Sequence, residues 1–416
     1  MENLISKDVN PHSLKLNVDN PFLAYPMSSD NQDRKIFTKV TATVRNVSGQ
    51  PLPGVQVFVS DESLNNLQKV KIYASDQETE IKLQLENGVE GFFVNTDKHG
   101  NLLFFIYPLK SEALIIRLFS QIPGSAEQTP ANYIIYIVNN TLQDMKQEFV
   151  GPEILNFLDG PLISKAKSKF LVKVEKYDGA LSGDTILFFV NGNYTEQSIQ
   201  ISSENDLDSY FPLPYAIFPK DQMSDFFYIV IRKLGDLVFS KSRILSLTYK
   251  GNEYNEPWTD VDRIYESCKV YSSYGVFDDS LIEQYDLISN NTISKYLENP
   301  NHEGLFIQII GTNDPNDTKK APLGSQVTLN LYINSKTEIV TKSYTKTMSN
   351  FPDIQGNNTA TLTFGISHEV LKYKEAYIDK SAKIFFDYQI GSDNNLDVTY
   401  GKIWQGYIDT NLDSFI

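Results

Sequence analysis

Few residues of this chain have the chemistry of a catalytic nucleophile. There is a single cysteine, Cys268, and no Gly-x-Ser-x-Gly motif. The pairs Asp260/Asp262 and Asp278-Asp279 would suit acid–base hydrolysis if they faced each other across a cleft. Such pairs more often lie in solvated loops or at helix starts, and a lone cysteine is more often a small buried apolar residue. We therefore expect no enzyme, with a hydrolase carrying β accessory domains as the remaining alternative.

Oxygen-rich loops make calcium the metal that the sequence favours. The runs 313–317 and 393–397 concentrate Asp and Asn, which supply the hard oxygen ligands that calcium prefers. Neither run fits the EF-hand pattern, and Asp and Asn also dominate ordinary turns. Apart from calcium we expect no cofactor, since one cysteine excludes a multi-cysteine zinc site. The predicted ligands are Asp314, Asp317, Asp393 and Asp397.

A group of aromatic residues is the main signal for binding. Tyr and Trp are enriched in recognition surfaces because they combine a large contact area with a polar tip. The alternative is that these side chains pack a connection between domains, and exposure in the folded protein decides between the two interpretations. The predicted binding residues are Tyr254, Trp258, Tyr265, Tyr271 and Tyr274.

Composition excludes several kinds of partner. The 416 residues include 37 Lys and Arg against 52 Asp and Glu, a net charge of −15. This acidic excess repels nucleic acid, and the longest apolar runs have the length of a strand and cannot span a membrane. The first 15 residues lack the basic and apolar regions of a Sec signal. We expect a protein that is secreted or placed on the cell surface by another route, or one that stays cytoplasmic until it is released.

Alternating patterns predict an all-β chain. From Ile36 to Arg45, apolar and polar residues alternate as in a strand with one wet face, and Asn46–Gly54 reads as a turn into a second strand. These two strands and the turn predict a hairpin. Similar short strands recur to the end of the chain, apart from residues 251–302, where two capping patterns predict short helices, one of them containing Cys268.

The strand rhythm divides the chain into three consecutive immunoglobulin-like β-sandwich domains, with a short helical linker before the third. The predicted segments are an N-terminal arm (1–34), domain 1 (35–148), domain 2 (149–250), a partly helical linker (251–302) and domain 3 (303–416).

One part of the chain resembles a known family. The run Thr41–Phe58 and the later turn Asn95–Asn101 are similar, in order and separation, to motifs of bacterial immunoglobulin-like domains of the invasin and intimin type. The likeness covers residues 36–138, and a weaker likeness to degenerate immunoglobulin-like repeats extends through the second unit. The chain lacks the outer-membrane barrel and lysin motif that accompany such repeats in full-length adhesins.

The resemblance implies a non-enzymatic, multidomain binding protein. Its rigid domains would space loops that recognise a protein or a glycan of a host, as in an adhesin or a virulence-associated factor. The first alternative is a structural or accessory subunit of a secreted toxin or injection assembly, in which the domains act as spacers.

Overall fold

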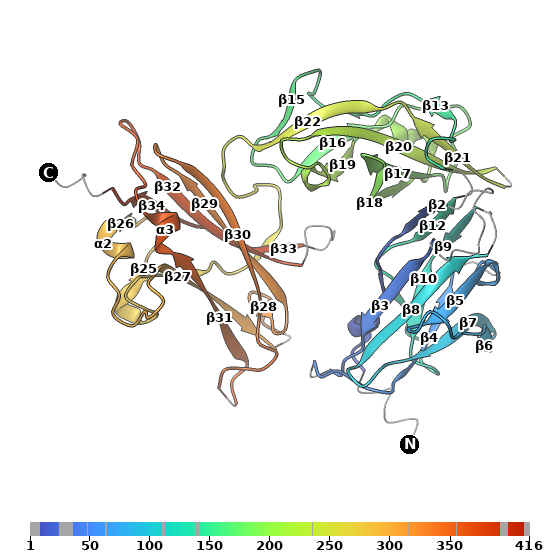
Figure 1. The fold of residues 1–416 in the computed structure, drawn as a ribbon, viewed down its shortest axis with the longest axis horizontal. Helices are drawn as coiled ribbons and strands as arrows, with labels where there is room; N and C mark the ends of the chain where they lie inside the picture. The colour runs from blue at the N-terminus through green and yellow to red at the C-terminus, as the bar shows by residue number, and fades with distance from the viewer. Residues whose placement is uncertain are drawn as a thin grey trace. The chain divides into compact units, whose positions relative to one another are not determined.

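The computed structural model describes residues 9–24, 36–47, 49–62, 65–109, 113–138, 141–234, 236–314, 316–354, 356–391 and 398–411. The chain forms two compact units, and its middle third contributes to both. Unit 1 comprises Met1–Leu158, Leu171–Phe211 and Ser224–Leu247, whereas unit 2 comprises Asp159–Phe170, Pro212–Met223 and Thr248–Ile416. Strands dominate both units (Figure 1).

The part of unit 1 up to residue 138, which we call the first module, contains three sheets. One has the order β1 (Asn17–Val18), β3 (Thr38–Thr43), β8 (Asn101–Pro108), β5 (Val70–Ala74). The next has the order β11 (Thr129–Pro130), β10 (Leu118–Gln121), β4 (Gln56–Asp61), β7 (Val89–Asn95), β6 (Gln84–Glu86). The third has the order β2 (Phe22–Ala24), β12 (Ile135–Val138), β9 (Leu114–Ile116). The described residues of the module also form two short 3-10 turns, η1 (Pro11–Leu14) and η3 (Leu67–Lys69).

The predicted alternation of the first strand is confirmed. In β3, Thr38, Val40 and Ala42 are buried, whereas the residues between them are partly exposed. Part of the segment predicted as an N-terminal arm also belongs to the module, because β1 pairs with β3 and β2 pairs in parallel with β12. The alternate side chains of β3 that the sequence assigned to one face are therefore the ones that point into the core.

The predicted first hairpin is wrong. β3 pairs with β1 and β8, whereas β4 pairs with β10 and β7, so the two strands lie in different sheets. The turn between them is an arch that crosses from one sheet to the other, closed by a bridge between Arg45 and Pro51. The Asp97 turn likewise joins β7 and β8 of different sheets. Gly and Pro set the local backbone of a turn, but the pairing of the strands that leave it is decided by the rest of the core.

The remainder of unit 1 contains one larger sheet with the order β13 (Gln147–Phe149), β21 (Asp236–Ser242), β20 (Met223–Leu234), β17 (Thr185–Val190), β18 (Asn193–Gln200). β14 (Glu153–Ile154) pairs with β16 (Lys169–Lys173), and a 3-10 turn, η4 (Glu204–Asp208), follows β18. A hydrophobic cluster joins this sheet to the first module. Its fully or largely buried members are Tyr136, Val138, Met145, Leu187, Phe189, Phe227, Ile229, Ile231 and Phe239.

β15 (Pro161–Ser164), in unit 2, pairs in parallel with β22 (Leu245–Asn252), which begins in unit 1 and belongs to unit 2 from Thr248. β19 (Phe211–Pro214) leads into the 3-10 turn η5 (Tyr215–Ile217). The rest of the unit is a two-sheet module, which we call the C-terminal module. One sheet has the order β23 (Arg263–Tyr265), β33 (Thr399–Gly401), β32 (Lys383–Ile390), β29 (Gln326–Asn334), β30 (Ile339–Thr347), with β34 (Trp404–Asp409) paired on β32 and β26 (Leu287–Ser289) paired on β34. The other has the order β25 (Leu281–Ile282), β24 (Lys269–Ser272), β27 (Glu303–Thr312), β28 (Ala321–Pro322), with β31 (Thr359–Ser367) paired on β27.

The helices predicted between residues 251 and 302 are wrong. Ile264 and Tyr265 lie on β23, and Cys268 follows in an extended segment before β24. The second predicted helix is replaced by the 3-10 turn η6 (Asp278–Ser280) and by β25 and β26; the four-residue α2 (Asn290–Ile293) begins only where the prediction ended. Each predicted helix rested on only three apolar side chains at helical spacing. The pairing of β23 with β33 and of β26 with β34 decides the conformation instead.

The fold class is confirmed as mostly β, with several sheets consistent with multiple immunoglobulin-like sandwiches. The number of domains, three, stays a prediction. Among the described residues, no helix has both the length and the apolar character needed to cross a bilayer; the two α-helices described there, α2 and α3 (His368–Leu371), are four residues each.

Candidate functional site: an anchored tyrosine loop

Two of the five predicted binding residues are part of the core of the C-terminal module. Tyr265 is 7% exposed, and its ring stacks on that of Tyr388 with 6.3 Å between centroids. Tyr271 is 6% exposed, and its hydroxyl donates to Gln308 Oε1 at 3.3 Å. These two side chains therefore face the interior and do not present a surface to a partner.

The other three predicted residues are exposed to different degrees. Tyr254 is 50% exposed, whereas Trp258 and Tyr274 are half-buried. The carbonyl oxygen of Trp258 accepts a hydrogen bond from Arg263, and the ammonium of Lys295 lies 6.0 Å from the ring centroid of Tyr274. The structure thus does not gather the five residues on one face, and a binding role for Tyr254, Trp258 and Tyr274 stays a prediction.

The carboxylates predicted to bind calcium are engaged with their own loop where they are described. Asp314 Oδ1 accepts hydrogen bonds from the backbone and the side chain of Asn316. Asp317 pairs with the ammonium of Lys320, and that contact holds the pKa of Asp317 below its usual range. Asp393 and Asp397 lie outside the described residues. Within the described part of the chain, no three His, Cys, Asp or Glu side chains gather as a metal site would require.

Cys268 is buried, and its burial raises the pKa of the thiol. A thiol in this state is a poor nucleophile at neutral pH, because the thiolate is the reactive form. Of the acidic pairs, Asp260 accepts hydrogen bonds from the backbone amides of Ser168 and Lys169. Its carboxylate therefore serves to hold two segments of unit 2 together.

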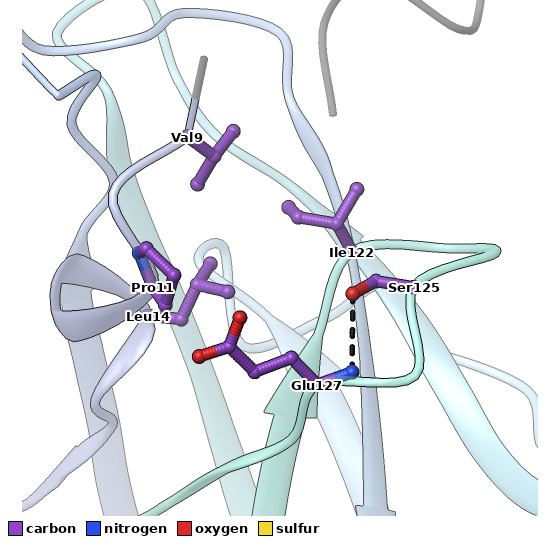
Figure 2. Close-up of a pocket in the computed structure, with 6 residues that line it drawn as sticks. All are labelled: Val9, Pro11, Leu14, Ile122, Ser125 and Glu127. Carbon is purple, nitrogen blue, oxygen red and sulfur yellow. Dashed lines mark hydrogen bonds between the residues drawn. The ribbon is translucent and has the colours of Figure 1, made fainter. Parts of the chain in front are cut away.

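A small pocket opens in the first module beside η1 (Figure 2). Its volume is about 40 Å³, far below the roughly 300–1,000 Å³ of typical small-molecule sites. Val9, Pro11, Leu14 and Ile122 form apolar walls, and a hydrogen bond from the Glu127 amide to Ser125 Oγ closes one side. A pocket of this size accommodates a few water molecules.

The segment Lys372–Lys380, which we call the tyrosine loop, is the strongest candidate for a contact surface. It connects α3 to β32 in the C-terminal module. Ile378 is 96% exposed and Tyr373 is 54% exposed, while Tyr377 is half-buried. Connecting loops carry binding residues more often than the elements they join, so these exposed side chains make the loop a candidate contact surface.

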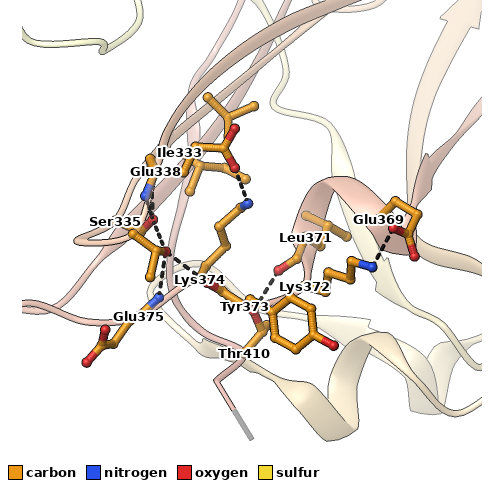
Figure 3. A network of polar contacts seen from close by, with 12 residues as sticks. Ile333, Ser335, Glu338, Glu369, Leu371, Lys372, Tyr373, Lys374, Glu375 and Thr410 are labelled. Carbon is orange, nitrogen blue, oxygen red and sulfur yellow. Dashed lines mark hydrogen bonds and ion pairs between the residues drawn. The ribbon is translucent and has the colours of Figure 1, made fainter.

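A buried lysine anchors the loop. Lys374 is 4% exposed, and its ammonium lies 2.6 Å from Glu338 Oε2, at the turn between β29 and β30 (Figure 3). Its backbone amide donates to Thr410 Oγ1 at 2.9 Å, and its carbonyl oxygen accepts from the Thr410 amide at 2.8 Å. A buried ammonium is stable only when it is paired, so this contact holds the loop against the sheet.

Further hydrogen bonds tie the loop to the β29–β30 turn on both sides of Lys374. Thr337 Oγ1 donates to the carbonyl oxygen of Tyr373 at 2.8 Å, and the Lys336 amide donates to the carbonyl oxygen of Glu375 at 2.9 Å. The hydroxyl of Tyr377 donates to the carbonyl oxygen of Ser335 at 3.0 Å. The base of the loop is therefore fixed, while its exposed side chains remain available.

Tyr373 itself has an unusual backbone. Its φ of 58° lies in the left-handed region, which is uncommon for a residue with a large side chain. The bond from Thr337 to its carbonyl oxygen and the bonds of Lys374 hold this conformation. Strained backbone of this kind concentrates at functional sites, because elsewhere a relaxed conformation is favoured.

Lysine side chains cover one part of each tyrosine ring. The ammonium of Lys372 lies 5.3 Å from the ring centroid of Tyr373, and that of Lys380 lies 4.7 Å from the centroid of Tyr377. Lys372 also pairs with Glu369 on α3. These cation–π contacts restrict the rings, so less conformational entropy is lost when a partner binds.

Only a faint signal for this loop exists in the sequence, and it was missed. Residues 372–380 place two tyrosines and one isoleucine among charged residues, between an expected strand and the next. Nothing in that pattern reveals that Lys374 is buried, because its partners Glu338 and Thr410 are each 36 residues away.

No protein-family model matches the chain, and no curated protein matches it. Similar solved structures are immunoglobulin-like domains. The D0–D1 domains of intimin give a TM-score of 0.24 at 14% identity, over 56% of this chain and 97% of that chain. Invasin, a bacterial integrin-binding protein, gives a TM-score of 0.19 at 12% identity, over 96% of this chain and 60% of that chain. A 282-residue C-terminal intimin fragment, in complex with the intimin-binding domain of its receptor, gives a TM-score of 0.20 at 10% identity. The match covers 84% of this chain and 99% of that chain. Scores this low say nothing about what this chain binds.

Proposed function

We propose that the chain is a non-enzymatic, multidomain binding protein that contacts a protein or glycan partner through the tyrosine loop. It would act outside the cell that makes it. The β-sandwich modules serve as a rigid support, and the loop supplies the contact.

A single observation supports the proposal best: the exposed side chains of Tyr373 and Ile378 stand on a loop whose base is fixed by the buried Lys374. A fixed loop binds with a smaller entropy cost than one that must become ordered. Tyrosine supplies a large and rigid contact area, which suits both protein surfaces and sugar rings.

The test is binding of the fluorescently labelled full chain to a printed glycan array and to cultured epithelial cells. The proposal predicts saturable binding on at least one of these probes. Parallel incubations with calcium and with a chelator decide the role of Asp314, Asp317 and the other predicted ligands. Absence of saturable binding on both probes, in both conditions, would contradict the proposal.

A structural subunit is a second candidate, and one observation favours it. The hydrophobic cluster that joins the first module to the larger sheet of unit 1 makes these two parts a single body, as a spacer requires. Phe22 of β2 and Phe189 of β17 meet edge to face across it, with 4.9 Å between ring centroids. Co-purification in a fixed stoichiometry with a larger assembly, combined with no binding to cells or glycans, would favour this candidate.

A further inference from the structure

Strand β31 has one side without a neighbouring strand. Its register with β27 sets Thr361, Thr363 and Gly365 opposite Ile310, Gln308 and Phe306. Within the described residues, β27 is the only strand paired with it. In an antiparallel pair, alternate residues direct both backbone groups away from the neighbour. The Thr361 N–H and the Thr363 C=O bond to Asp353 and Lys346, which are not part of this sheet. The backbone groups of Thr361, Thr363 and Gly365 therefore point to the open edge.

This open edge has the composition of a strand that pairs easily. The nine residues of β31 include neither a charged residue nor a proline. Such an edge is a template for a further strand, and proteins normally protect it with charges, prolines or a cover. The protection of β31 must therefore come from residues outside the strand.

Two charged side chains supply that protection. Asp353, in the loop after β30, accepts from the Thr361 amide through Oδ2 at 2.7 Å, and its own amide donates to the carbonyl oxygen of Thr359 at 3.0 Å. Lys346, on β30, donates to the carbonyl oxygen of Thr363 at 2.8 Å, with its ammonium 5.2 Å from the ring centroid of Phe364. Each cap satisfies a backbone group that an added strand would need.

The capped groups are the ones that a second copy of the same edge would use. In an antiparallel pair centred on Thr363, the Thr363 N–H of one copy faces the Thr363 C=O of the other, and the Thr361 N–H faces the Gly365 C=O. Lys346 occupies the Thr363 C=O and Asp353 occupies the Thr361 N–H. In this pair, only the bonds from the Gly365 N–H of one copy to the Thr361 C=O of the other are not blocked by the caps. These bonds do not compensate for the translational entropy that two chains lose when they associate.

We propose that β31 is a pairing surface for a second copy of this chain, held closed by Asp353 and Lys346. The two side chains act together as an autoinhibitory contact: while they bind the edge, the strand cannot complete a ladder with another copy. Removal of both side chains frees the Thr361 N–H and the Thr363 C=O, and the uncharged strand then pairs with itself.

Sedimentation velocity of the full chain tests this proposal. We expect the wild type to be monomeric at micromolar concentrations and the double variant Asp353→Ala/Lys346→Met to form a dimer whose fraction rises with concentration. The matched control is Asp379→Ala/Lys342→Met, which removes the same charges from exposed positions elsewhere in the C-terminal module and is expected to stay monomeric.

Adding Thr363→Pro to the double variant separates strand pairing from misfolding. The substitution removes the central N–H of the open edge but no bond to β27, since that N–H faces away. We expect the triple variant to return to a monomer with an unchanged circular dichroism spectrum. A double variant that stays monomeric, or a triple variant that dimerises as strongly as the double variant, would overturn the proposal. None of these results depends on whether the tyrosine loop binds a partner.

Discussion

At the scale of the residue, the C-terminal module contains a fully buried carboxylate. Asp387, on β32, accepts from Arg263 at 2.8 Å and from Asn330 Nδ2 at 3.1 Å. Burial raises the pKa of Asp387, and the contacts with Arg263 and Asn330 oppose that rise. A buried pair of this kind contributes little net stability, but removing one partner leaves the other charge buried and uncompensated.

Replacing Arg263→Ala is therefore expected to lower the free energy of unfolding of unit 2 by about 3–5 kcal/mol. Both tryptophans, Trp258 and Trp404, lie in unit 2, so urea unfolding followed by tryptophan fluorescence reports on this unit. Lys383→Ala is the control, because it breaks an exposed pair with Glu256 and should cost at most about 1 kcal/mol. Equal effects of the two changes would show that Asp387 does not depend on its arginine.

Asp76, in the turn after β5, has the clearest pH signature of the exposed groups. The side-chain hydroxyl of Thr79 and the amides of Thr79 and Glu78 donate to its carboxylate and lower its pKa from 3.8 to about 2. A lowered folded-state pKa stabilises the fold above about pH 4, and this contribution is lost as the pH falls through about 2. Carboxyl NMR titration should give a midpoint near 2 for Asp76, and Thr79→Ala should move it upward. A wild-type midpoint near 3.8 would show that the turn does not form in solution.

At the scale of the element, periodicity predicted strands well and their partners poorly. The alternation in β3 identified the buried face, because a strand with one buried face has an apolar or small residue at every second position of the sequence. The turn residues of Asn46–Gly54 did not reveal that the chain crosses to another sheet, because a hairpin and an arch use the same turn chemistry. The strands β23 and β26 were missed because three residues with helical spacing do not outweigh pairing with distant strands.

The anchor of the tyrosine loop can be tested without a partner. Lys374→Met keeps the length of the side chain but removes its bond to Glu338, a charge-assisted bond of about 1.5–3 kcal/mol. We expect amide hydrogen exchange in residues 373–375 to accelerate about tenfold or more, since those amides and carbonyls hold the loop to Thr410 and Thr337. Lys342→Met, at an exposed position of β30 outside the loop, is the control and should leave that exchange unchanged. Equal protection in both variants would contradict the anchoring role.

The cluster shared by the first module and the larger sheet of unit 1 predicts that the two unfold together. Phe189 is fully buried and contacts Phe22 and Tyr194, so Phe189→Ala should cost about 3–5 kcal/mol. Hydrogen exchange should then lose protection in β12 as well as in β17. Val47→Ala, at a residue that is 69% exposed, is expected to change stability by less than about 0.5 kcal/mol. Loss of protection in β17 alone would mean that the modules are coupled only weakly.

At the scale of the whole molecule, the pattern of short strands was sufficient for the fold class but not for the contact surface. The alternation of apolar and polar residues indicated a mostly β protein, which the structure confirms. The predicted aromatic site was dispersed on folding, because Tyr265 and Tyr271 are needed in the core. The tyrosine loop becomes visible only when distant residues such as Glu338 and Thr410 meet Lys374, and a single sequence does not contain that information.

The C-terminal module offers a matched pair of exposed apolar surfaces for a decisive comparison. Tyr373 and Ile378 are 54% and 96% exposed on the tyrosine loop, whereas Phe351 and Ile354 are 59% and 64% exposed on the loop that follows the other end of β30. Removing either pair deletes one aromatic and one aliphatic side chain from an exposed loop. The two double variants therefore differ mainly in which loop they alter.

The measurement is the saturation binding of three labelled chains, side by side, to the cell type or glycan that retains the wild type. The chains are the wild type, Tyr373→Ser/Ile378→Ser and Phe351→Ser/Ile354→Ser. Loss of two contact residues worth about 2 kcal/mol or more should weaken binding by the first variant at least about 30-fold. The second variant should bind within about threefold of the wild type, as expected for a surface outside the contact. Equal binding by all three chains, or loss only in the Phe351/Ile354 variant, would show that the tyrosine loop is not the contact surface.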